Sequence, residues 1–108
     1  AAGLVLKLVP TKDILLEVTK RKSGKLVVGF AAESQNLVES GLAKLKKKNL
    51  DLIVANDISA PGIGFQSDSN QVTIIDREEK IENLPLKPKR EIADILLDRI
   101  LARFKNPE

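Results

Sequence analysis

The chain has 108 residues and a formal net charge of +3, from 18 basic and 15 acidic residues, and it contains neither cysteine nor histidine. This length predicts one domain over residues 1–108. The composition excludes thiolate nucleophiles, Cys or His metal sites and a Ser-His-Asp triad, and the small basic excess does not itself indicate nucleic acid. No apolar run approaches the roughly 20 residues that cross a bilayer, and no signal peptide is recognisable. We therefore expect a cytoplasmic protein with no membrane partner.

The amino-terminal third is predicted to form a strand, a helix and a second strand. Residues 4–9 alternate in polarity and are partly β-branched, which is typical of a strand. Thr11 can cap a following helix through its hydroxyl group, and Ser23–Gly24 would end that helix. The apolar residues on one side of this helix would be Ile14, Leu15 and Val18. Residues 26–30 form a continuous apolar run, which indicates a strand buried on both faces.

A second helix is expected from about Ser34 to Lys48. If Leu37 is set at zero and each residue turns the helix by about 100°, the other apolar residues fall within about 140° on one side. Lys44 and Lys48 then lie about 20° to either side of Leu37, at the border of the buried stripe, whereas the two lysines between them point away. Lys44 and Lys48 can therefore extend along the sheet edge toward a site.

The remaining residues are predicted to form a strand, a loop, a hairpin and a final helix. Residues 50–55 indicate the next buried strand, and residues 58–70 are rich in Gly, Ser, Asp and Pro, as in a loop. Residues 71–76 and 80–86 have the pattern of a β-hairpin. Pro88 occupies a position where a helix can start. The inner stripe of that helix would contain Ile92, Ile95, Leu96 and Ile100.

The strand–helix–strand order points to a ligand site. Two buried strands joined by a helix form a right-handed parallel unit, and ligands bind at the carboxyl ends of such strands. The residues at these ends are Phe30, Ala31, Ala32, Asn56 and Asp57. We expect Phe30, Lys44 and Lys48 to converge on one cleft that suits a base and its phosphates. The alternatives are a core position for Phe30 and a solvated helix face for the two lysines.

Four segments resemble one known family. They are GFAAES (Gly29–Ser34), KKNLDLIVANDIS (Lys47–Ser59), GFQSDSN (Gly64–Asn70) and LPLKPKREIADILLDRI (Leu84–Ile100). In sequence and order they closely resemble the carboxyl-terminal half of the phosphopantothenoylcysteine synthetase domain, which in bacteria is usually fused to a flavin-dependent decarboxylase of coenzyme A biosynthesis. Together with the pattern above, the resemblance implies a partial α/β domain. Its fold would be Rossmann-like and three-layered, with parallel strands, an added β-hairpin and a final helix.

The resemblance also implies an activity. The family activates the carboxylate of phosphopantothenate with CTP, assisted by magnesium, to give an acyl-cytidylate and pyrophosphate. The amine of cysteine then attacks, and CMP leaves. FMN belongs only to the fused decarboxylase, and no metal ligand is carried over. The CTP contacts carry over to Thr11, Lys12, Asp13, Ile14, Phe30, Lys44 and Lys48. The family usually has Asn-Pro-Asp-Ile where this chain has Thr-Lys-Asp-Ile, which keeps a capping residue but loses the proline.

The catalytic residues of the family have no counterpart in this chain. Its glycine-rich strand-turn, the asparagine tied to the acyl-cytidylate and the lysine-rich flap belong to the half that the resemblance does not cover. We therefore predict negligible catalysis by these residues alone. A nucleotide-binding module without activity is the alternative. A nucleic-acid binder based on the lysines of the second helix is less favoured, because no aromatic residues lie between them.

The predicted hairpin also suggests a partner. Its apolar residues Val72, Ile74, Ile81 and Leu84 would form one face beside an open edge, and such edges are usually covered. We therefore expect a homodimer that uses this hairpin. The segment Gly64–Asn70 is either a turn between strands or a contribution to the active site or to a partner subunit.

Overall fold

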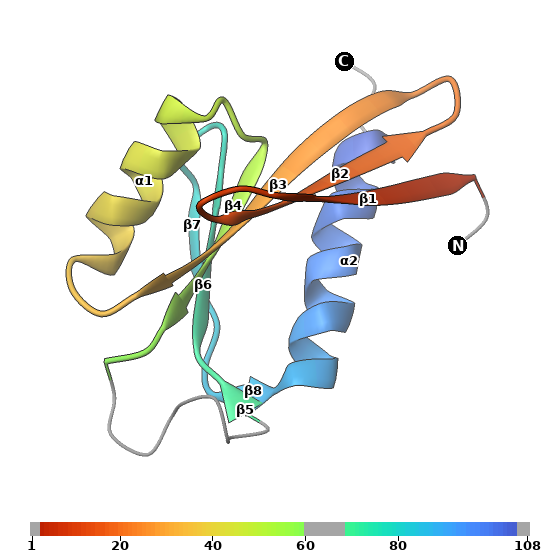
Figure 1. Cartoon of the computed structure of the whole chain (residues 1–108). Helices are drawn as coiled ribbons and strands as arrows, with labels where there is room; N and C mark the ends of the chain where they lie inside the picture. Colours follow the sequence, from red (N-terminus) through yellow and green to blue (C-terminus); the bar gives the residue numbers. More distant parts are fainter. Residues whose placement is uncertain (1–2, 60–68, 106–108) are drawn as a thin grey trace.

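The computed structural model describes residues 3–59 and 69–105, and its central feature is a six-stranded sheet with helices on opposite faces (Figure 1). The strand order is β1-β2-β3-β4-β6-β7, and β5 and β8 form a separate pair. The strands are β1 (Leu4–Pro10), β2 (Ile14–Lys20), β3 (Gly24–Glu33), β4 (Leu52–Asp57), β5 (Ser69–Asn70), β6 (Val72–Asp76), β7 (Ile81–Asn83) and β8 (Lys87–Pro88), and the helices are α1 (Leu37–Lys47) and α2 (Lys89–Lys105). This arrangement confirms the expected three-layer α/β fold with a hairpin and a final helix.

The sheet is mixed. Strands β3 and β4, which α1 connects, pair in parallel, whereas the other neighbours in the six-stranded sheet pair antiparallel. The parallel strand–helix–strand unit is therefore confirmed. Helix α1 starts later than expected because Asn36 before it has a φ of 49°, in the left-handed region. No helix in the described ranges combines the length and apolar composition needed to cross a membrane.

The prediction of a helix after Thr11 is wrong. Residues 14–20 form strand β2, which pairs with β1 on one side and with β3 on the other. This pairing covers the edge of β3, whose backbone N–H and C=O groups would otherwise lack sheet partners. The Thr11 hydroxyl caps a turn instead, because it accepts a hydrogen bond of 3.1 Å from the backbone N–H of Asp13 and donates one to the Asp13 carbonyl oxygen.

A hydrophobic core lies on each face of the sheet. On the α2 face, buried residues of the strands pack with Ile92, Leu96 and Ile100, as the predicted stripe of that helix requires. On the α1 face, Leu45 of the helix packs with sheet residues and Leu50. Gly41 lets α1 approach the sheet closely, since a Cβ atom there would lie 3.1 Å from Cδ1 of Ile75. Helix α1 is therefore held at a short distance from β6.

The expected β-hairpin is confirmed as β6 and β7, but its apolar face is not free. Val72, Ile74 and Leu84 are buried in the core on the α2 face, whereas Ile81 is 43% exposed. Since helix α2 covers most of this apolar surface, the hairpin does not offer the open face on which the homodimer was expected. The larger set of exposed apolar side chains belongs to β1 and the start of β2, namely Val5, Leu6, Leu8 and Ile14.

Candidate functional site

The turn between β1 and β2 is tied to helix α1 by two lysines. The Lys48 Nζ donates to Asp13 Oδ2 at 2.6 Å, and the Lys44 Nζ lies 3.5 Å from Asp13 Oδ1. Lys44 also lies 3.0 Å from Oε2 of Glu33, near the carboxyl end of β3. Both lysines are half-buried, whereas Lys46 and Lys47 are exposed. The predicted difference between these two pairs of lysines is therefore confirmed.

Ion pairing shifts the pKa values of Asp13 and Lys44 in opposite directions. The hydrogen bond from Lys48 lowers the pKa of Asp13 below its ordinary value of 3.8, with a further contribution from Lys44. The hydrogen bond to Glu33 raises the pKa of Lys44 above 10.5, and the charge of Asp13 adds to this effect. Two ammonium groups and two carboxylates thus balance each other. An anionic ligand that binds these ammonium groups would compete with their carboxylate partners.

Phe30 lies on the opposite face of the sheet. It packs against the core that contains α2 and lines a pocket of about 550 Å³ together with Ile14, its partner in the β2–β3 register. The polar side of this pocket is formed by Asn56, Asn70 and Lys89. The Asn70 Nδ2 donates to Asn56 Oδ1 at 3.1 Å. The pocket therefore combines an aromatic wall with amide groups at the carboxyl end of β4.

The expectation of one cleft shared by Phe30, Lys44 and Lys48 is wrong. Successive side chains of a strand point to opposite faces, so Phe30 faces α2 whereas Glu33, three residues later, faces α1 and pairs with Lys44. The sheet itself separates the aromatic ring from the two ammonium groups. A cleft on one face cannot contain all three side chains.

The seven residues nevertheless surround one structural feature, an edge of β3 that β2 does not cover. The β2–β3 register ends at the pair of Ile14 and Phe30, and β3 continues through residues 31–33. These three residues pair with β4 on their other side. The turn of residues 11–13 borders this edge, with the pocket of Phe30 on one face and the lysines on the other. We call this feature the β3 edge.

The remaining predicted residues have different surroundings. Lys12 is exposed in the turn. Asp57 accepts hydrogen bonds from the backbone N–H and the hydroxyl group of Ser59, at 2.9 and 2.6 Å, and they lower the pKa of its carboxyl group. Most of the segment Gly64–Asn70 lies outside the described residues. Sequence reasoning missed Glu33, although its position three residues after Phe30 in a strand places it on the other face.

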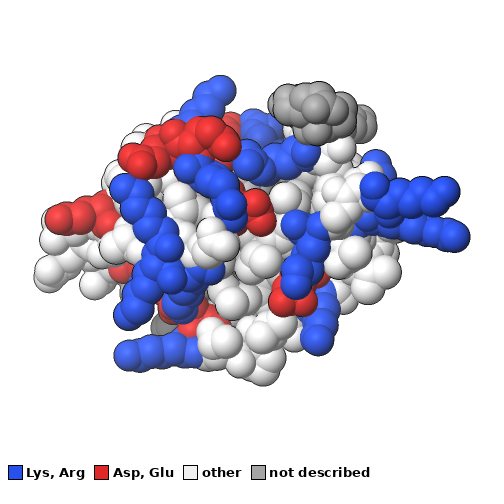
Figure 2. Space-filling view, turned by 90° about the horizontal axis from the view of Figure 1, so that it is seen from above, with Lys and Arg blue, Asp and Glu red and all other residues white. Residues whose placement is uncertain are grey.

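Metal binding and nucleic-acid binding have little support in the described residues. Ranges 3–59 and 69–105 contain no group of three His, Cys, Asp or Glu side chains that could hold a metal ion. Basic side chains on the face seen in Figure 2 stand in several groups separated by uncharged surface, with acidic side chains among them. A continuous basic stripe, which a nucleic-acid backbone requires, does not run across this face.

Comparison with known proteins gives consistent relatives. Residues 1–104 match the family described as DNA/pantothenate metabolism flavoprotein C-terminal domain. The chain is 43% identical over 103 residues to the coenzyme A biosynthesis bifunctional protein CoaBC of Bacillus subtilis and 42% identical to that of Escherichia coli, covering 95% and 94% of this chain and 25% of each relative. It is also 42% identical over 99 residues to a cysteine/cysteine sulfinic acid decarboxylase of an unknown prokaryotic organism, covering 91% of this chain and 28% of that protein.

A solved structure supports the same relationship. The crystal structure of the C-terminal domain of coenzyme A biosynthesis bifunctional protein CoaBC matches with a TM-score of 0.63 and 32% sequence identity, covering 94% of this chain and 54% of that chain. The chain therefore spans about half of the solved domain and about a quarter of the curated relatives. On the match over residues 1–104, the chain belongs to the DNA/pantothenate metabolism flavoprotein C-terminal domain family.

Proposed function

We propose that this chain supplies part of the CTP site of a phosphopantothenate–cysteine ligase, which joins phosphopantothenate and cysteine in coenzyme A biosynthesis. The observation that carries the proposal is the grouping of the seven motif residues around the β3 edge. The family resemblance names these residues, and their placement around the β3 edge supports the proposal even though Phe30 and the two lysines lie on opposite faces of the sheet. The family's catalytic residues belong to the half that the resemblance does not cover, so turnover would require residues beyond those that this chain provides.

The triphosphate would bind on the α1 face. Lys44 and Lys48 approach the same carboxylate, so their ammonium groups are already positioned close together. Phosphate oxygens would replace Asp13 and Glu33 as partners. Such an exchange keeps both lysines hydrogen-bonded, and it places positive charge beside the departing pyrophosphate, where negative charge develops.

The cytosine and ribose would bind on the α2 face. Phe30 offers an aromatic surface for the base, and Asn56 and Asn70 offer amide groups for hydrogen bonds. The nucleotide would cross from one face to the other at the β3 edge. Backbone groups of residues 31–33 that β2 leaves unpaired can donate or accept hydrogen bonds there.

The family resemblance also implies magnesium and FMN as cofactors. Magnesium would neutralise phosphate charge as the family requires, but the described residues offer no three-ligand cluster for it, so we assign it no protein ligand. FMN would belong to a fused or associated decarboxylase domain and not to these residues. We place the reaction in the cytoplasm, which agrees with the absence of cysteine.

Self-association is proposed through β1 instead of through the hairpin. Strand β1 is a seven-residue edge of the sheet, and Val5, Leu6 and Leu8 on it are each more than 60% exposed. Open edges with apolar side chains readily pair with another chain. A second copy that pairs with β1 would cover both the edge and these side chains.

Calorimetric titration tests the proposed CTP site. We expect CTP to bind more tightly than ATP, and a Lys44→Ala/Lys48→Ala variant to bind CTP at least about tenfold more weakly, because two charge-assisted contacts are lost. The matched control is Lys46→Ala/Lys47→Ala, which removes the same charge from exposed positions on the same helix. Equal and weak binding of both nucleotides to all three proteins would refute the site. Steady turnover by this chain alone would contradict the proposal that the catalytic residues lie outside it.

A further inference from the structure

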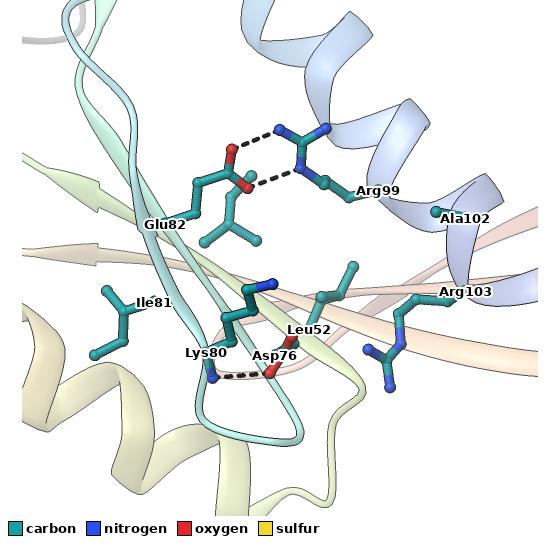
Figure 3. Close-up of a pocket in the computed structure, with 9 residues that line it drawn as sticks. Leu52, Asp76, Lys80, Ile81, Glu82, Arg99, Ala102 and Arg103 are labelled. Atoms are coloured by element: carbon teal, nitrogen blue, oxygen red, sulfur yellow. Dashed lines mark hydrogen bonds and ion pairs between the residues drawn. The ribbon is translucent and has the colours of Figure 1, made fainter. Parts of the chain in front are cut away.

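A second pocket lies far from the β3 edge, between the β6–β7 hairpin and the carboxyl-terminal half of α2 (Figure 3). Its volume is about 440 Å³. It contains Leu52, the first residue of β4, whereas the pocket of Phe30 contains Asn56 near the other end of that strand. The two pockets share no lining residue. We call this second site the hairpin pocket.

One wall of the hairpin pocket is an ion pair between Arg99 and Glu82. The Arg99 Nε donates to Glu82 Oε1 at 2.7 Å, and its Nη2 donates to Glu82 Oε2 at 2.5 Å, so the pair is bidentate. These hydrogen bonds lower the pKa of Glu82. Figure 3 shows the two side chains reaching toward each other from the hairpin and the helix. Arg99 and Glu82 therefore join the hairpin to helix α2, and their opposite charges compensate each other in this wall.

Two other cations do have spare donors. The Arg103 Nη1 donates to Glu78 Oε1 at 3.2 Å, but Glu78 is exposed. The Arg103 Nε is buried and has no hydrogen-bond partner in the described part of the chain. The Lys80 ammonium forms no ion pair with any carboxylate of residues 3–59 and 69–105, although its charge contributes to lowering the pKa of Glu82. A buried N–H without a partner is costly, so a ligand that accepts its hydrogen bond would be favoured.

The rest of the lining defines the body of such a ligand. Leu52, Ile74 and Ala102 provide apolar surface, whereas the Ile81 side chain points away from the pocket (Figure 3). Asp76 accepts a hydrogen bond of 2.9 Å from the backbone N–H of Lys80, so its carboxylate is engaged in the hairpin turn. The lining contains three basic and two acidic side chains, which leaves an excess of one positive charge. A volume of 440 Å³ is that of a small-molecule site.

We propose that the hairpin pocket binds a small organic anion whose carboxylate or phosphate head contacts Lys80 and Arg103 and whose apolar body rests on the leucine and isoleucine side chains. The head would displace the exposed carboxylate of Glu78 from Arg103. A planar guanidinium suits both carboxylate and phosphate oxygens, and an apolar floor beside it excludes water from the contact. This site is separate from the proposed CTP site and does not depend on it.

Titration of the full 108-residue chain with phenyl phosphate and benzoate, followed by NMR and calorimetry, tests the proposal. We expect saturable binding of at least one of them, with chemical-shift changes confined to the hairpin and the carboxyl-terminal half of α2. Comparison of the two probes identifies the preferred head group. Benzyl alcohol, which has a similar body and no charge, should bind at least about tenfold more weakly, because it cannot form the charge-assisted contacts.

Matched variants locate the contacts. Lys80→Ala and Arg103→Gln should each weaken binding by about tenfold, whereas Glu78→Gln should strengthen it severalfold because it removes the competing carboxylate. Lys47→Ala is the control, since Lys47 is exposed on helix α1, which packs on the other face of the sheet. Circular dichroism and thermal unfolding establish that each variant is folded. Equal binding of the anions and benzyl alcohol, or equal effects of Lys80→Ala and Lys47→Ala, would overturn the proposal.

Discussion

Asp13 and Lys48 join the β1–β2 turn to helix α1 through a hydrogen bond of 2.6 Å between Lys48 Nζ and Asp13 Oδ2. The contact links residues that are 35 positions apart in sequence, and it occupies an ammonium group that the proposed site needs for phosphate. Asp13 therefore holds the lysines in place and competes with an anionic ligand for them.

Replacing Asp13 separates these two roles. In Asp13→Asn, Lys44 and Lys48 lose a negative partner, so inorganic triphosphate should bind severalfold more tightly. Because the resemblance gives Asp13 a contact with CTP as well, the preference for CTP over triphosphate should fall. Calorimetry with both ligands measures the two effects. Weaker binding of triphosphate would show that Asp13 positions the lysines more than it competes with phosphate.

Acid should weaken the fold through two carboxylates. The pKa of Asp13 is lowered by Lys48, and that of Glu82 by Arg99. A lowered folded-state pKa stabilises the protein above the unfolded-state pKa of about 4, and the contribution is lost as the pH falls through the folded-state pKa. Urea unfolding at pH 7 and pH 3 measures this effect. Between these two pH values, the free energy of unfolding should fall less for Asp13→Asn and Glu82→Gln than for the unaltered chain. Each variant should be less stable at pH 7 by about 0.5–1 kcal/mol.

A rise to high pH should also weaken the fold, because Lys44 then loses its charge. The pKa of Lys44 is raised, mainly by Glu33, so its contribution is complete below the ordinary value of 10.5 and disappears as the pH rises through the folded-state pKa. No described pair places such a loss near neutrality. A steep change in stability between pH 6 and pH 8 would contradict these assignments, and the same unfolding series measures it.

Two glycines should respond differently to alanine. A Cβ atom at Gly29 would lie 2.6 Å from Cδ1 of Leu50, which is 2% exposed and cannot easily move. Overpacking of this kind costs about 1–3 kcal/mol, so Gly29→Ala should lower the free energy of unfolding. At Gly41 the closest atom is 3.1 Å away, and alanine gains about 1 kcal/mol of helix propensity, so Gly41→Ala should be nearly neutral. Chemical denaturation measures the free energy of unfolding of both variants. Equal changes would contradict the close packing of Leu50 against Gly29 of β3.

Association through β1 should depend on its exposed apolar residues. Leu8 is 67% exposed, so Leu8→Lys removes apolar contact and adds a charge that opposes edge pairing. We expect sedimentation to show concentration-dependent dimers of the unaltered chain and a monomer for this variant. Ile81→Lys on the hairpin is the control and should leave the dimer intact. Loss of dimers in the control alone would instead support the hairpin as the dimer interface, as the sequence suggested.

Sequence patterns predicted those helices and strands in which apolar residues recur at the spacing of one buried face. Helix α1 has one apolar stripe that packs on the sheet, and this stripe placed Lys44 and Lys48 at its border. Residues 14–20 could not be assigned in this way. Their Leu, Glu and Lys residues favour a helix, while Ile14, Val18 and Thr19 favour a strand, and pairing with β1 and β3 decides the outcome.

The division of the candidate site between two faces was also beyond the sequence. Residues 26–30 are apolar on both sides of the strand, so nothing in the pattern says which side α1 covers. Val28 packs toward α2 and Val27 toward α1, and Phe30 follows the alternation of Val28. The residues named from the sequence stay a prediction as a site, and their arrangement on two faces depended on a register that only the folded chain defines.

Phe30→Leu tests this arrangement directly. If the base binds to Phe30 on the α2 face and the phosphates bind to the lysines on the α1 face, loss of the ring should weaken CTP about tenfold, since stacking on a base is worth about 1–3 kcal/mol, and should leave inorganic triphosphate unchanged. Lys48→Ala should weaken both ligands. Because Phe30 also packs in the core, thermal unfolding must establish that the variant is folded at the titration temperature. Equal weakening of CTP and triphosphate by Phe30→Leu would mean that the two faces do not divide the nucleotide between them.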